Sequence, residues 1–167
     1  MVSAIVAVDK NWGLGKNGKR LLSIPEDVKF FREITSGNTV IMGRKTFESF
    51  YQGKPLPNRI NIVVTSDMDF KTDGVLAAHS PEEAMKLAAA SGKDAYIVGG
   101  GQVYAEMLRF CDEIHVTYID YKYEADAFFP NLDKLPEWVL VAESDEQTNF
   151  DIIYFFRKYQ RRADYRP

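Results

Sequence analysis

Asp27 is the residue whose type and position point most directly to chemistry. It lies in the segment Ser23 to Ile34, Ser-Ile-Pro-Glu-Asp-Val-Lys-Phe-Phe-Arg-Glu-Ile. On a helix, spacings of three and four place it on one face with Ile24 and Phe31. A carboxylate walled by apolar side chains binds protons more readily unless a ligand supplies hydrogen bonds, so it could hold an amidine-like ligand and help to protonate it. The alternative is an acid that only meets the positive end of the helix dipole.

A pair of cations follows the second apolar segment, residues 38–42. Gly43 ends this predicted strand, and Arg44, Lys45 and Thr46 begin a short predicted helix. Backbone N–H groups and positive side chains would converge on a phosphate there; the alternative is an ordinary solvated basic turn. An acid at this strand end would suit a free ribose 2′-hydroxyl, whereas two cations suit a 2′-phosphate. A nicotinamide cofactor bound here is therefore predicted to be NADP.

Three consecutive glycines form a second candidate phosphate site, between a buried strand over 95–98 and a helix that reaches about residue 110. A turn alone rarely needs three glycines, and their backbone can approach a pyrophosphate closely. The stretch consists of Val98, Gly99, Gly100, Gly101, Gln102, Val103 and Tyr104.

Other candidate side chains stand at the ends of the remaining predicted strands. Arg59 follows the stiff turn 51–58 and could clamp a carboxylate in two parallel hydrogen bonds, or lie on the surface. Thr65 and Ser66 end the strand after it. His79 precedes a helix cap, where it is either incidental or faces a phosphate. No metal site is predicted.

The elements that position these residues alternate along the chain. Short β-branched and apolar segments predict buried strands at 2–8, 38–42, 60–64, 75–78, 95–98 and 113–119. A capping box at Ser23 and Glu26 predicts the helix that carries Asp27, and Ser80 is predicted to cap another that reaches about Ala90. Strands at 138–143 and 151–159, joined by polar residues 144–149, predict an antiparallel hairpin.

This order predicts an α/β fold. Its mainly parallel central sheet has about eight strands, helices on both faces and a C-terminal antiparallel hairpin, in a single domain over residues 1–167. Ligands of such sheets bind at the carboxyl ends of the strands. The loop after the first strand, Gly43 to Thr46, Thr65 to Ser66 and Gly99 to Tyr104 all fall there, which predicts a dinucleotide site.

Residues 9–20 contain the letters G-x-G-x-x-G at Gly13, Gly15 and Gly18. The dinucleotide fingerprint joins a strand tightly to a helix, whereas here several residues separate the glycines from both predicted elements. We therefore predict a long, glycine-hinged loop, of the length typical of lids and binding loops.

Composition sets outer limits on the function. The chain has 167 residues, 46% of them hydrophobic, a net charge of -3 and one cysteine. This charge argues against nucleic acid or an anionic membrane as a partner. The lone Cys111 excludes an internal disulfide and suits a reducing compartment, and Ala4 to Val8 is too short an apolar run to span a membrane. We expect a cytoplasmic protein without a membrane segment.

Taken together, these motifs resemble the dihydrofolate reductase family over essentially the whole chain. The matching segments are Ile5 to Ala7, Gly13 to Gly18, Pro25 to Phe31, Val40 to Ser49, Pro55 to Arg59, Val98 to Tyr104, Thr117, Asp126 and Phe129-Pro130. Each segment is weak alone, but all of them in this order are specific. The resemblance implies NADPH-dependent reduction of 7,8-dihydrofolate to tetrahydrofolate by a monomer that also binds antifolate inhibitors.

The resemblance also assigns roles by position. Asp27, supported by Thr117, would hold the pterin and promote protonation of N5, and the first loop would close over both ligands with Asp126 as its partner. Substrate contacts would come from Ile5, Ala7, Val28, Phe31, Phe50 and Arg59. Cofactor contacts would come from Ala7, Leu14, Gly15, Gly43, Arg44, Lys45, Thr46, Thr65, Ser66, His79, Val98, Gly99, Gly100, Gly101, Gln102, Val103 and Tyr104.

The chain also departs from the family pattern. Leu21-Leu22 stands where Pro-Trp is usual, which removes an indole N–H that commonly orders water near the pterin. Arg20 in the closing loop and Gln102, where a basic residue is common, are smaller departures. Two rival hypotheses remain: an NADPH-dependent pyrimidine reductase of riboflavin synthesis, against which Asp27 and Phe31 argue, and a non-catalytic folate or nucleotide carrier.

Overall fold

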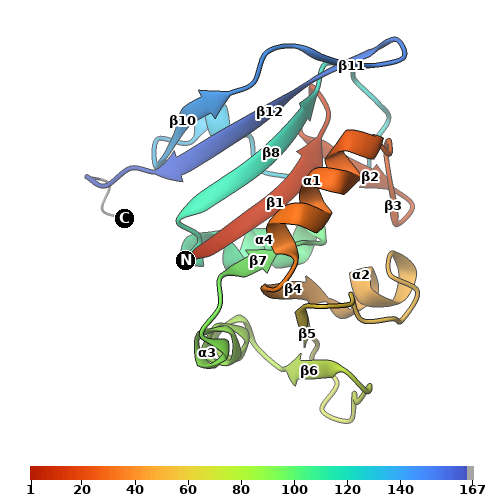
Figure 1. The fold of residues 1–167 in the computed structure, drawn as a ribbon, viewed down its shortest axis with the longest axis vertical. Helices are drawn as coiled ribbons and strands as arrows, with labels where there is room; N and C mark the ends of the chain where they lie inside the picture. Colours follow the sequence, from red (N-terminus) through yellow and green to blue (C-terminus); the bar gives the residue numbers. More distant parts are fainter. Residues whose placement is uncertain (165–167) are drawn as a thin grey trace.

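A mainly parallel sheet forms the centre of the molecule, as the sequence predicts (Figure 1). The computed structural model of the chain describes residues 1–164. In this part of the chain the sheet has the spatial order β10, β12, β8, β1, β7, β4, β5, β6, with β11 paired to β12. Neighbours from β8 to β6 are parallel, and β12 is antiparallel to β8, β10 and β11. The strands are β1 (Val2–Val8), β4 (Thr39–Gly43), β5 (Ile60–Val64), β6 (Val75–Ala78), β7 (Ala95–Ile97), β8 (Glu113–Ile119), β10 (Trp138–Glu143), β11 (Gln147–Asn149) and β12 (Ile152–Arg161).

Helices cover both faces of this sheet, and α1 and α4 lie on opposite sides of it in Figure 1. Successive side chains of β4 point to opposite faces of the sheet, so helices can pack on both. Ile41 packs in the cluster that contains Ala88 of α3 and Met107 of α4. The next residue, Met42, packs with Phe47 of α2. Both faces of β4 are therefore buried, which explains its run of three large apolar residues from Val40 to Met42. The helices are α1 (Pro25–Thr35), α2 (Arg44–Ser49), α3 (Pro81–Ser91) and α4 (Gly101–Met107), with 3-10 turns η1 (Leu108–Phe110) and η2 (Leu132–Lys134).

The start of α1 differs from the prediction. The N-cap residue is Ile24, in an extended conformation with φ −109° and ψ 121°, and no side chain caps the helix. The prediction of a capping box at Ser23 and Glu26 was wrong. Pro25 gives the reason, because the residue before a proline is forced toward extended backbone and the helix can begin only at the proline itself. The cap predicted for α3 is confirmed, since the Ser80 side chain accepts a hydrogen bond from the Glu83 N–H.

Residues 9–20 are not one open loop, so that prediction was also wrong. They contain a hairpin of β2 (Gly13–Lys16) and β3 (Lys19–Arg20), and β2 pairs further with β9 (Ala127–Phe128) in a second, three-stranded sheet. Asn17 and Gly18 turn the hairpin with φ values of 53° and 76°. Two positive φ angles in a two-residue turn match the twist of paired strands, and Asn-Gly adopts them readily.

Two aspartates hold this hairpin in place. Asp9 is fully buried, and its carboxylate accepts hydrogen bonds from the N–H groups of Gly13 (2.7 Å) and Tyr123 (2.8 Å). At the other end, Asp126 accepts a hydrogen bond from the Asn17 N–H at 3.0 Å. The expectation that Asp126 holds the first loop is confirmed.

The C-terminal hairpin of β10 and β12 is confirmed, with one addition. The polar connection at 144–149 contains a third strand, β11, which pairs with β12 through a turn at Phe150 and Asp151. Its three residues show no alternation of apolar and polar side chains, so no local pattern predicts a strand there.

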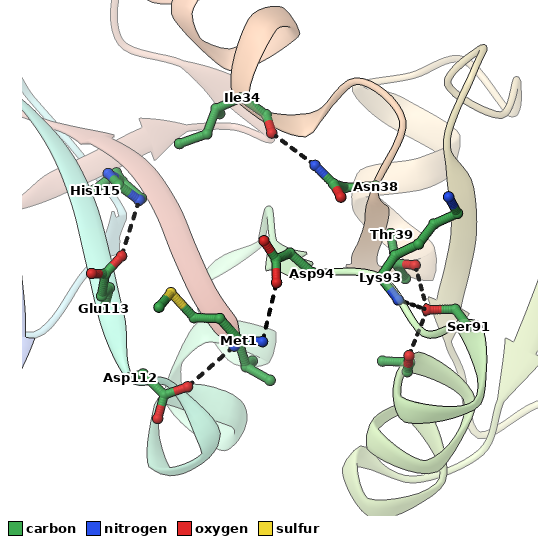
Figure 2. A network of polar contacts seen from close by, with 12 residues as sticks. Met1, Ile34, Asn38, Thr39, Ser91, Lys93, Asp94, Asp112, Glu113 and His115 are labelled. Carbon is green, nitrogen blue, oxygen red and sulfur yellow. Dashed lines mark hydrogen bonds and ion pairs between the residues drawn. The ribbon is translucent and has the colours of Figure 1, made fainter.

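At the amino edge of the sheet, polar contacts join the ends of neighbouring elements (Figure 2). The amino group of Met1 lies 3.1 Å from a carboxylate oxygen of Asp94, and the Val2 N–H donates to Asp112. The Thr39 hydroxyl donates to the Ser91 hydroxyl oxygen at 3.0 Å. Open space for a ligand is found at the opposite, carboxyl edge. Among residues 1–164, every helix falls short of the length and hydrophobicity that a membrane crossing requires.

Candidate active site

A cleft of about 1200 Å³ opens at the carboxyl edge of the sheet. It is larger than most single-ligand pockets and can hold two ligands side by side. It runs from α1 and the β2–β3 hairpin, past the ends of β1, β4 and β7, to the start of α3. The candidate residues that line it are Ile5, Ala7, Leu14, Gly15, Asp27, Val28, Phe31, Gly43, Arg44, Lys45, Thr46, Phe50, Thr65, Ser66, His79, Val98, Gly99, Gly100, Gly101, Gln102, Val103 and Tyr104.

Asp27 lies at one end of this cleft, in the first turn of α1. The Thr117 hydroxyl, on β8, donates a hydrogen bond to its carboxylate at 2.6 Å. Burial raises the pKa of the Asp27 carboxyl above its ordinary value, while the Thr117 hydrogen bond and the positive charge of Arg20 oppose that rise. Thr117 is itself buried and does not line the cleft. Asp27 is therefore an acid with raised proton affinity. Thr117 holds its carboxylate from the core of the protein, and the carboxylate also faces the cleft, where a ligand can reach it.

Apolar walls flank this acid. Val28 and Phe31 project from α1, Phe50 follows the end of α2, and Ile5 comes from β1. The apolar face of α1 is only half-buried because it borders the cleft instead of the core. Such a gap suits a flat ring whose polar edge meets Asp27 and whose faces contact hydrocarbon.

The glycine turn between β7 and α4 forms the middle of the cleft. The Gly43 N–H donates a hydrogen bond to the Gly99 carbonyl oxygen at 2.9 Å, which ties the ends of β4 and β7 together. Gly99 has φ 119°, and an added Cβ would lie 3.3 Å from the ring of Tyr104. The Gly99–Gly100 peptide bond is cis. A Cβ on Gly100 would lie 3.1 Å from the Thr46 hydroxyl oxygen. Glycine therefore leaves bare backbone facing the cleft, which is a surface that a pyrophosphate can approach.

Cations gather at the far end of the cleft. Arg44 donates hydrogen bonds to Glu48 and Asp67, each at 2.7 Å. Lys45 is exposed and forms no ion pair within residues 1–164. His79 packs here with its Nδ1 atom 3.0 Å from the Thr65 carbonyl oxygen. This end can bind an anionic group, in competition with two carboxylates that already contact Arg44.

Arg59 is the predicted substrate residue that the structure places outside the cleft lining. Its guanidinium lies 5.8 Å from the ring centre of Phe31, so it sits just beyond the α1 wall. Burial lowers the pKa of Arg59, and the nearby charge of Arg32 lowers it further. Its Nε atom is buried and has no hydrogen-bond partner in the part of the chain that the structure describes. A buried, unpaired donor beside a second cation is an arrangement that an anionic ligand would stabilise.

Sequence reasoning missed Tyr51, which lines the cleft next to Phe50. Burial raises the pKa of its hydroxyl to about 12, so Tyr51 stays neutral and can donate a hydrogen bond. No spacing pattern marks it in the sequence. Leu22, which stands at the usual tryptophan position, does not line the cleft and packs with Ile24, Ile119 and Tyr154.

A parallel sheet whose carboxyl edge carries a glycine-rich turn, a group of cations and a shielded acid is typical of the class of nicotinamide-dependent reductases that act on small heterocycles. A model of the dihydrofolate reductase family matches residues 1–161. The dihydrofolate reductase of Bacillus subtilis is 36% identical over 166 residues, covering 97% of this chain and 95% of that protein. The Staphylococcus aureus enzyme is 39% identical over 129 residues, 77% of each chain.

Similarity in three dimensions agrees with similarity in sequence. The solved structure of dihydrofolate reductase from Enterococcus faecalis complexed with NADP(H) and RAB-propyl aligns with a TM-score of 0.87 and 37% identity, over 96% of each chain. The chain belongs to the dihydrofolate reductase family.

Proposed function

We propose that the cleft is the active site and that Asp27 is its acid. The chain reduces 7,8-dihydrofolate to 5,6,7,8-tetrahydrofolate, and NADPH provides the hydride. The observation that carries the assignment of the site is the Asp27 carboxylate, shielded by α1 and bonded to Thr117 at 2.6 Å, at the end of a cleft with room for two ligands.

At the substrate end, the carboxylate of Asp27 accepts hydrogen bonds from the 2-amino group and N3 of the pterin. Its raised proton affinity increases the local supply of protons, and a water molecule carries one to N5, which makes the ring a better hydride acceptor. Ile5, Val28 and Phe31 exclude other water and hold the pterin ring in contact with the nicotinamide ring of NADPH. Ala7, on β1, also lines this part of the cleft.

The benzoyl-glutamate part of the substrate extends over Phe50 and past Phe31 toward Arg59. Arg59 binds the α-carboxylate of the glutamate, because a carboxylate would satisfy its unpaired Nε donor. The positive charge of Arg32, on the exposed side of α1, adds to this attraction. These residues determine substrate affinity and do not take part in proton transfer.

The cofactor half of the cleft fits NADPH. The bare backbone from Gly99 to Gly101 admits the pyrophosphate, and Arg44 and Lys45, with Thr65, Ser66 and His79 opposite, receive the 2′-phosphate. Bound NADPH supplies the hydride that is transferred to C6. Leu14, Gly15 and Ala7, together with Val98, Val103 and Tyr104, line the space where the nicotinamide meets the pterin. Thr46 and Gln102 complete the lining around the pyrophosphate.

We also propose that the enzyme acts as a monomer in the cytoplasm and that antifolates compete for the substrate end. A single chain supplies both the Asp27 acid and the glycine turn from Gly99 to Gly101, so one monomer contains the parts of a whole site. Cys111 is a buried free thiol, in keeping with a reducing compartment.

An absorbance assay of NADPH oxidation tests the proposal against its rivals. We expect oxidation that depends on dihydrofolate in the intact chain and a large loss of turnover in Asp27→Asn. Glu26→Gln is the matched control, because it removes the neighbouring, exposed carboxylate of α1 and should leave turnover near normal. Binding of both ligands without turnover would favour a carrier, and turnover of a pyrimidine substrate alone would favour the pyrimidine reductase.

A further inference from the structure

Arg20 reaches across the mouth of the cleft. It belongs to β3, where it pairs with Gly15, and its guanidinium lies 4.3 Å from the ring centre of Phe50 beyond the end of α2. The side chain is exposed, yet it lines the same cleft as Asp27 and Tyr51. A cation–π contact therefore connects the hairpin with the opposite wall at the substrate end.

The charge of Arg20 acts on three groups inside this end of the cleft. It lowers the pKa of Asp27, of Tyr51 and of Tyr104, in each case against the larger effect of burial, which raises it. Within residues 1–164, Arg20 is the cation whose charge acts on Asp27. The titratable groups that sense the charge of Asp27 from other elements are Tyr104 of α4 and Tyr154 of β12, and burial raises the pKa of both, so they remain neutral near neutral pH.

Resting on the proposed function, we propose that Arg20 is a positioning residue for proton delivery: it holds a positive charge over the substrate end, favours the ionised form of Asp27, and so sets the upper pH limit of dihydrofolate reduction. The reaction consumes one proton as well as one hydride, so its rate falls when the site can no longer bind a proton. A cation held beside the acid moves that fall to lower pH.

The pH dependence of kcat/KM for dihydrofolate tests this inference. Arg20→Met keeps an unbranched side chain but removes the charge, and the falling limb of its profile should move up by about half a pH unit, the size expected of one solvent-exposed charge that acts on the acid. Arg20→Lys retains the charge and should keep the wild-type profile. Higher salt should move the wild-type limb toward that of Arg20→Met, because the side chain is exposed.

Lys54→Met is the matched control, since it removes an exposed cation that does not line the cleft and should leave the profile unchanged. Thermal unfolding with and without NADPH verifies that each variant folds and binds cofactor. An unmoved limb in Arg20→Met overturns the inference, and so does an equal shift in Arg20→Met and Arg20→Lys, which would assign the effect to the shape of the contact with Phe50. Absence of dihydrofolate turnover in the wild-type chain would instead overturn the proposed function.

Discussion

The two ends of the cleft use charge in opposite ways. At the substrate end one carboxylate, Asp27, is shielded by apolar walls and held by a single buried hydroxyl, that of Thr117. At the cofactor end the charges of Arg44 and Lys45 are partly or wholly exposed, and Arg44 already has two acidic partners. A shielded charge interacts strongly with what touches it, whereas water and salt weaken an exposed one. On the proposed assignment of the site, the chemistry therefore depends on one residue, and recognition of the cofactor is shared among several.

The largest effect should come from the shielded acid. Asp27→Asn keeps the shape of the side chain but removes the proton-binding carboxylate, so turnover of dihydrofolate at neutral pH should fall by about 10² to 10⁴. Steady-state kinetics with saturating NADPH measure this loss. NADPH affinity should stay within a few-fold of wild type, because the residue lies at the other end. A near-normal rate would show that the acid function lies elsewhere.

Arg44→Ala should have a smaller and more selective effect. A charged hydrogen bond contributes roughly 1.5 to 3 kcal/mol, so NADPH should bind about 10 to 100 times more weakly, while NADH, which lacks the 2′-phosphate, should lose much less. Fluorescence titration of both cofactors measures the difference, and its salt dependence should be strong. Equal losses for NADPH and NADH would mean that Arg44 does not contact the 2′-phosphate.

The buried strands were predictable because each carries its own signal. β1 and β4 are short, almost entirely apolar segments, and burial on both faces favours that pattern. The hairpin of β2 and β3 has no such signal, since glycines and lysines fill its strands. Its turn did carry one, because Asn17-Gly18 is the dipeptide that a two-residue hairpin turn prefers. The partner strand β9 could not be found locally, since it has two residues and pairs with a segment far away in the sequence.

The site shows the same limit. The position of Asp27 on an apolar helix face predicted a shielded acid, but its bond to Thr117 joins residues 90 positions apart, and only the family resemblance pointed to that partner. The contacts of Arg44 with Asp67 and of Arg20 with Phe50 likewise depend on how loops meet in space. Local sequence patterns indicate which residues are available for chemistry, and the fold determines which of them meet.

Shielding should also have a cost that appears in stability. The pKa of Asp27 is higher in the folded chain than its ordinary value, so its contribution to stability is present at pH below about 3.9, the unfolded pKa, and is lost as pH rises through the folded pKa. Without ligands, Asp27→Asn should therefore unfold at a higher temperature than wild type at neutral pH, by roughly 2 to 4 °C, and the difference should shrink in acid. Thermal unfolding followed by circular dichroism across pH measures it. Glu26→Gln should show no such gain, and a less stable Asp27→Asn at neutral pH would contradict the interpretation of Asp27 as a charge held at a cost.

The smallest effect should come from an acid at the exposed end. Asp67 contacts Arg44 at 2.7 Å, so a 2′-phosphate must displace it or share the guanidinium with it. Exposed ion pairs contribute about 0.2 to 1 kcal/mol, and Asp67→Asn should therefore tighten NADPH binding only about two- to five-fold, with no change for NADH. Asp69→Asn is the matched control, because Asp69 is an exposed acid on the same loop and forms no ion pair within the described residues. Titration of each variant with both cofactors at low salt gives the comparison. Weaker NADPH binding in Asp67→Asn would mean that Asp67 holds Arg44 in position for the phosphate, and the exposed end would then depend on a fixed geometry as the shielded end does.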